Sequence, residues 1–136
     1  MATRILLVDD EPNNLYLLEK MLKPYGLIFS ATSGEEGFEM FQKAHQAKKP
    51  FDVLFLDIVM LDGIQGDEVQ RRIREWESFY LQLDDPVISI VIASTVRKRE
   101  MIEQMIEEGG QFYMNKPYRI ENIVKIMDAL GIEVKH

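Results

Sequence analysis

Five residues of the sequence combine acidic, hydroxyl and basic chemistry, and each stands just after a short apolar run. Asp9 and Asp10 follow the first run, Asp57 follows the third, Ser94 the fourth and Lys116 the fifth. Three neighbouring carboxylates repel one another and need a cation, and all-oxygen ligands select a hard ion such as Mg²⁺. Such an ion, a lysine and a hydroxyl would together neutralise a phosphoryl group. These residue types predict a phosphoryl site in which Asp57 is the nucleophile and forms an aspartyl phosphate.

The apolar runs themselves predict the elements that position these residues. They are too short for helices, and their apolarity is continuous, which is typical of strands covered on both faces of a parallel sheet. The runs are Ile5–Val8, Leu27–Phe29, Val53–Leu56, Val87–Ile92 and Phe112–Met114. Each is therefore predicted to be a strand.

A segment with helical periodicity follows each run. The apolar stripes are Leu15, Leu18 and Leu22; Phe38 and Phe41; Val69, Ile73, Trp76, Tyr80 and Leu83; Met101, Ile102, Met105 and Ile106; and Ile120, Ile123, Met127 and Leu130. The alternation predicts an α/β fold of five βα units, a doubly wound parallel sheet with right-handed crossovers. Sites in such sheets form at the carboxyl ends of the strands, where the five reactive residues would gather.

Length and composition limit the class of protein. The 136 residues fit a single domain over residues 1–136, with its core at about 3–131 and a short C-terminal tail. No apolar run is long enough for a membrane span or a signal-peptide core, and there is no cysteine, which together predict a cytoplasmic protein without membrane contact. The net charge of −7 argues against direct nucleic-acid binding, because affinity for a duplex depends largely on neutralising phosphates.

Two longer motifs carry a resemblance to a known family. They are "ILLVDDEPNNLYLLEKML", residues 5–22, and "FYMNKPY", residues 112–118. With Asp57 and Ser94 at fitting separations between them, the chain resembles the response-regulator receiver domain, the family of the bacterial chemotaxis response regulator. The resemblance covers nearly the whole chain. It implies a five-stranded sheet of flavodoxin-like order 2-1-3-4-5 and a phosphoacceptor switch of a two-component phosphorelay, which is not a turnover enzyme.

The resemblance also implies a role for each acid. Asp57 would accept a phosphoryl group from a histidine kinase or a histidine phosphotransfer domain. Asp10 would bind Mg²⁺ directly, Asp9 would act mainly through a water, and the main-chain carbonyl of Val59 would complete the protein ligands. The chain would thus promote its own phosphorylation and dephosphorylation at Asp57.

Other implied roles concern the switch. Ser94 and Lys116 would contact the phosphoryl group, and Ser94 and Tyr113 would respond to it. The Lys116–Pro117 bond would be cis. Phosphorylation would alter the surface of the fourth helix, fifth strand and fifth helix, roughly residues 97–130, for a downstream protein or effector domain.

The sequence departs from the family pattern in two places. Receivers usually have Met-Pro after the acceptor, but Met60 is followed by Leu61, and Gly66 lies about one residue later than the pattern expects. We therefore expect an insertion in the loop 61–66. The residues two past the nucleophile and two past the hydroxyl are Val59 and Val96, and neither can position an attacking water, which predicts a long-lived phosphoryl state.

Simpler interpretations remain open. Asp9 or Asp10 alone could cap the first helix, and Tyr113 could be a core residue. A receiver-fold domain that interacts without phosphorylation is the alternative function, although such domains usually lose an acid or the lysine. A hydrolytic phosphatase would need an acid where Val59 stands. A flavin-binding domain is disfavoured because the acids near Asp57 would repel the cofactor's phosphate.

Overall fold

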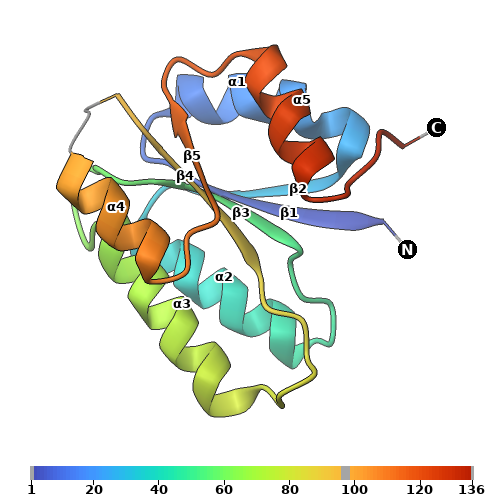
Figure 1. Cartoon of the computed structure of the whole chain (residues 1–136), viewed down its shortest axis with the longest axis vertical. Coiled ribbons are helices and arrows are strands. Elements are labelled where there is room, and N and C mark those ends of the chain that lie inside the picture. Colours follow the sequence, from blue (N-terminus) through green and yellow to red (C-terminus); the bar gives the residue numbers. More distant parts are fainter. Residues whose placement is uncertain (1, 96–98, 136) are drawn as a thin grey trace.

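The computed structural model describes residues 2–95 and 99–135, and its centre is a five-stranded parallel sheet (Figure 1). The strands lie in the order β2-β1-β3-β4-β5, which confirms the predicted doubly wound α/β fold. Their bounds are β1 Thr3–Val8, β2 Gly26–Ala31, β3 Val53–Asp57, β4 Ser89–Ser94 and β5 Phe112–Asn115. β3 is buried along its whole length, as expected for a central strand covered on both faces.

Helices cover both faces of the sheet. α1 and α5 lie on one face, and α2, α3 and α4 lie on the other (Figure 1). A short 3₁₀ helix, Lys23–Tyr25, follows α1. The bounds of the helices are α1 Pro12–Leu22, α2 Gly34–Gln46, α3 Gly66–Tyr80, α4 Arg99–Glu107 and α5 Ile120–Ala129. No helix in the described ranges is long and apolar enough to cross a bilayer.

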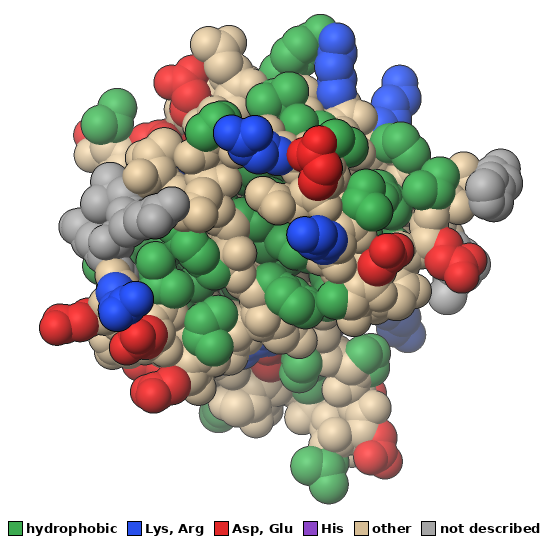
Figure 2. Space-filling view, turned by 45° about the horizontal axis from the view of Figure 1, so that its top comes forward, with side chains coloured by type: hydrophobic (Ala, Val, Ile, Leu, Met, Phe, Trp, Pro, Cys, Tyr) green, Lys and Arg blue, Asp and Glu red, His purple; other side chains and the backbone are tan. Residues whose placement is uncertain are grey.

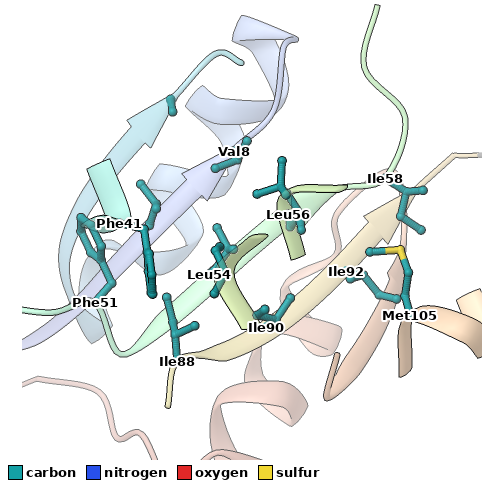
Figure 3. Close-up of a cluster of buried hydrophobic side chains, with 14 of the residues drawn as sticks. Val8, Phe41, Phe51, Leu54, Leu56, Ile58, Ile88, Ile90, Ile92 and Met105 are labelled. Atoms are coloured by element: carbon teal, nitrogen blue, oxygen red, sulfur yellow. The ribbon is translucent and has the colours of Figure 1, made fainter. Parts of the chain in front are cut away.

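The core on the α2–α4 side fixes the central strands. Leu54 and Leu56 of β3 and Ile90 and Ile92 of β4 point together beneath the helices (Figure 3). All four side chains are fully buried. Burial of one such side chain contributes about 1.5–3 kcal/mol. This packing makes the carboxyl ends of β3 and β4 a rigid support for whatever follows them.

The structure differs from the sequence prediction at the end of α3. Leu83 is predicted to belong to the apolar stripe of this helix, but the helix ends at Tyr80 and Leu83 is fully exposed. Leu81 already has extended backbone angles. The Gln82 N–H then donates to Asp85 Oδ2 at 2.8 Å, which forms a turn toward β4.

The start of β4 is also corrected. The apolar run predicts a strand from Val87, but pairing with β3 begins at Ser89 and continues to Ser94. Val87 is exposed, and the N–H of Ile88 donates to the buried carboxylate of Glu77 at 2.8 Å. The Glu77 side chain of α3 thus accepts the hydrogen bond from Ile88 that a neighbouring strand would otherwise accept, just before β4 begins.

Candidate functional site

Three acidic side chains meet at the carboxyl end of the sheet. Asp9 and Asp10 follow β1, and Asp57 is the last residue of β3. One carboxylate oxygen from each lies within 4.8 Å of the other two. Asp9 and Asp57 are buried, whereas Asp10 is half-buried. β1 and β3 are neighbours in the sheet, and this pairing brings together acids that are 47 or 48 positions apart in the sequence (57 − 10 and 57 − 9).

Lys116 places a positive charge among these acids. Its Nζ lies 2.7 Å from Asp9 Oδ2 and 3.2 Å from Asp57 Oδ1, and its side chain is only 6% exposed. It stands just past β5, before the cis bond to Pro117 that the resemblance implies. The Lys116 N–H also donates to the Ser94 carbonyl at 3.0 Å, which ties this segment to the end of β4.

The environment of Asp57 makes its charged form costly. Burial raises the pKa of Asp57 to about 6, and the negative charge of Asp9 acts in the same direction. The ammonium group of Lys116 and the N–H of Val59, whose nitrogen lies 3.4 Å from Asp57 Oδ1, oppose the rise in pKa. Any further positive charge at the site would therefore stabilise the charged form of Asp57.

Tyr118 is a neighbour that the sequence prediction missed. Its hydroxyl lies 3.5 Å from Asp9 Oδ2 and the residue is 5% exposed. Burial raises the pKa of Tyr118 well above its usual range, so the hydroxyl stays a proton donor to Asp9. The residue is the last one in the "FYMNKPY" motif, but only the folded chain shows that its side chain turns toward the acids.

The loop after β3 is held against the site by several side chains. Asp10 Oδ2 accepts from the Leu61 N–H at 2.6 Å, and Glu35 Oε1 accepts from the Ile64 N–H at 3.2 Å. Gly66 closes the loop: a Cβ at this position would lie 2.3 Å from the main-chain oxygen of Asp57. Gly66 therefore allows the start of α3 to approach β3 closely, in spite of its shifted place in the sequence.

Comparison with known proteins decides the family. A sequence profile described as the response regulator receiver domain matches residues 5–128. The chain belongs to this family. Among curated receiver relatives, PilH of Pseudomonas aeruginosa is 28% identical over 128 residues, which are 93% of this chain and 96% of PilH. The sensor protein GacS of Pseudomonas syringae is 25% identical over 126 residues, which are 93% of this chain but 13% of GacS.

A solved structure supports the same assignment. The response regulator protein TrrA of Thermotoga maritima, solved in complex with Mg²⁺ and BeF, shares 27% identity with this chain and has a TM-score of 0.74. The match covers 94% of this chain and 98% of TrrA. The fold is thus that of receiver domains, which are signalling switches of two-component systems.

The remaining predicted residues of this receiver domain also have defined places. Ser94 is buried at the end of β4, one residue past the Ala93 that pairs with Asp57. Tyr113 is half-buried against the core on the α2–α4 side, and its hydroxyl donates to Asn115 Oδ1 at 2.8 Å. Val59 is exposed next to Asp57. Val96 and the start of the predicted 97–130 surface lie outside the described residues.

The acid cluster of the receiver domain fits a small hard cation. Its donors are all oxygens, and they lie close enough together for one ion to contact them. Asp10 is the acid with the greatest exposure of the three, so an ion could reach it from solvent. The residues present therefore match the requirement for Mg²⁺.

Proposed function

We propose that this receiver domain is a phosphoacceptor switch and that Asp57 is the residue phosphorylated in a Mg²⁺-dependent reaction. The main support for the proposal is that two further acids and a buried lysine surround the Asp57 carboxylate at the carboxyl end of the sheet. A receiver-fold domain that had lost its chemistry would not need to keep three repelling carboxylates together. Phosphorylation therefore explains the arrangement better than a purely adhesive role.

Each residue has a defined part in this proposal. An oxygen of Asp57 forms the new bond to phosphorus while the donor's bond to phosphorus breaks. Lys116, 3.2 Å from Asp57 Oδ1, and the Ser94 hydroxyl bind the phosphoryl oxygens and hold them for in-line transfer. Asp10, Asp57 and the Val59 carbonyl would hold the ion, and Asp9 would contribute through a water. Bound Mg²⁺ supplies charge neutralisation for the transferred group.

The partners in this proposal are proteins. A histidine kinase or a histidine phosphotransfer domain supplies the phosphoryl group. A downstream protein or effector domain then binds the surface formed by α4, β5 and α5. On the face shown in Figure 2, basic side chains are interspersed with acidic and hydrophobic ones. That mixture does not resemble a surface that neutralises a nucleic-acid backbone, which supports a protein partner.

The first experiment is intact-mass measurement after incubation with a small-molecule phosphodonor. The wild type is expected to gain the mass of one phosphoryl group in the presence of Mg²⁺ and no mass when a chelator is added. Asp57→Asn is expected to gain none under either condition, because an amide oxygen is a poor nucleophile. A folded wild type that gains no mass with Mg²⁺ would favour the phosphorylation-independent interaction domain.

The phosphoryl group on Asp57 is expected to be long-lived. Val59, which is exposed beside Asp57, cannot orient a water for attack on phosphorus. We expect Val59→Asn to shorten the lifetime of the phosphorylated protein, since an amide at this position can hold a water. Decay of the phosphorylated mass after removal of the donor measures both lifetimes, and a wild-type lifetime of only seconds would contradict this prediction.

A further inference from the structure

Gln65 lies directly before α3, and its side-chain amide forms hydrogen bonds with both the N–H and the carbonyl of Met60. Gln65 Oε1 accepts from the Met60 N–H at 2.8 Å, and Gln65 Nε2 donates to the Met60 carbonyl at 2.9 Å. Nε2 also lies 3.3 Å from the Gly63 carbonyl. The half-buried Gln65 therefore uses both its acceptor and its donor on the loop between β3 and α3.

These bonds are not the usual ones for a residue at this position. Gln65 is the N-cap of α3, where a side chain commonly accepts from one of the first helical N–H groups. The side chain of Gln65 makes no such capping bond. It turns instead toward the loop that leads out of Asp57, so its role lies in that loop and not in starting the helix.

The bond to the Met60 N–H orients the peptide between Val59 and Met60. This peptide is trans, and in a planar trans peptide the N–H and the C=O point in opposite directions. Because the Met60 N–H points at Gln65, the Val59 carbonyl points away from Gln65. That carbonyl is the proposed main-chain ligand of Mg²⁺.

The bond to the Met60 carbonyl reaches Asp10 through the next peptide. The Met60 C=O accepts from Gln65, and the N–H of the same peptide, that of Leu61, donates to Asp10 Oδ2 at 2.6 Å. Amide, peptide and carboxylate thus form a continuous chain of hydrogen bonds, in which each bond polarises the next. Asp10 therefore lies on the opposite side of this peptide from Gln65, and the Val59 carbonyl also points away from Gln65.

We propose that Gln65 is a positioning residue for the metal site of this domain. It directs the Val59 carbonyl toward the ion and, through the Leu61 N–H, holds the carboxylate of Asp10. The inference rests on the proposed function, because it assigns Gln65 to the site that binds Mg²⁺ there. Leu61 contributes only its N–H, since its side chain is 92% exposed; a proline at this position would lack that donor.

The test is to titrate the purified, unphosphorylated protein with Mg²⁺ and to monitor binding by calorimetry and by ¹H–¹⁵N NMR. Gln65→Ala is expected to bind Mg²⁺ at least about tenfold more weakly than the wild type, the lower end of the effect of removing a residue that orients a metal ligand. The Leu61 amide proton is expected to shift upfield as its bond to Asp10 weakens. Gln46→Ala is the matched control, because it makes the same change at an exposed position at the end of α2 and should bind Mg²⁺ as the wild type does.

The outcomes separate this inference from the proposed function. Gln65→Ala that stays folded and binds Mg²⁺ with wild-type affinity would overturn the inference alone. Failure of the wild type to bind Mg²⁺ would overturn the proposed function, and the inference with it. If Gln65→Ala does not fold, Gln65→Asn replaces it, because its shorter amide cannot reach both groups of Met60 and the same weakening is expected.

Discussion

Replacing Lys116 with methionine is expected to lower the free energy of unfolding by about 3 kcal/mol at pH 8, the low end of the cost of breaking a buried ion pair. The Lys116 ammonium contacts Asp9 and Asp57, and all three side chains are nearly inaccessible to solvent. Methionine keeps most of the volume but leaves two buried carboxylates without a countercharge. Urea unfolding in the absence of Mg²⁺ measures the loss.

The loss caused by Lys116→Met is expected to be smaller at pH 5. Without the ammonium, which opposes the rise, the pKa of Asp57 lies above its value of about 6 in the wild type. A raised folded-state pKa means that the protonated form stabilises the fold at low pH and that this stability is lost as the pH rises through that pKa. Lys125→Met, at an exposed position on α5, is the control. A loss under about 1 kcal/mol at pH 8, typical of a surface pair, would contradict this prediction.

Replacing Asp57 with asparagine is expected to have the opposite effect and to stabilise the protein at pH 8 without Mg²⁺. The pKa of Asp57 rises from 3.8 to about 6 in the folded state, first because of burial, so the charged form opposes folding at neutral and alkaline pH. At about 1.4 kcal/mol for each pKa unit, the full gain would be about 3 kcal/mol. We expect about 2 kcal/mol, because solvent near the half-buried Asp10 screens part of the effect.

The pH dependence identifies the cause of this stabilisation. As the pH falls from 8 through about 6 toward 4, Asp57 becomes protonated in the folded wild type, and the difference between wild type and Asp57→Asn is expected to disappear. Asp128→Asn, an exposed position on α5, removes one negative charge away from the site and serves as the control. An Asp57→Asn protein that is less stable than the wild type at pH 8 would show that burial does not penalise this carboxylate.

Much of the fold and the centre of the site follow from the sequence. Continuous apolar runs identify most of β1, β3 and β5, because the buried parts of parallel strands are mainly apolar. Asp9, Asp57 and Lys116 are recognisable as the first charged residues beyond these runs. Parallel strands end at one edge of the sheet, so these residues had to gather there. The predicted pattern was less reliable at the ends of elements, where Leu83 follows the helical spacing but lies outside α3.

Only the tertiary structure decided which side chains contact one another at that edge. Lys116 lies nearer to Asp9 than to Asp57. Tyr118 turns toward Asp9 and Gln65 bonds the main chain of Met60, although neither spacing nor residue type distinguishes Tyr118 or Gln65 from surface residues. The Leu61 N–H reaches Asp10 from a loop 51 positions away. Such contacts depend on side-chain direction and on how distant elements pack, to within about an ångström, because a hydrogen bond weakens steeply beyond its short range. Sequence periodicity determines which face of an element is buried, but distances of this kind are set by the packing of the whole domain.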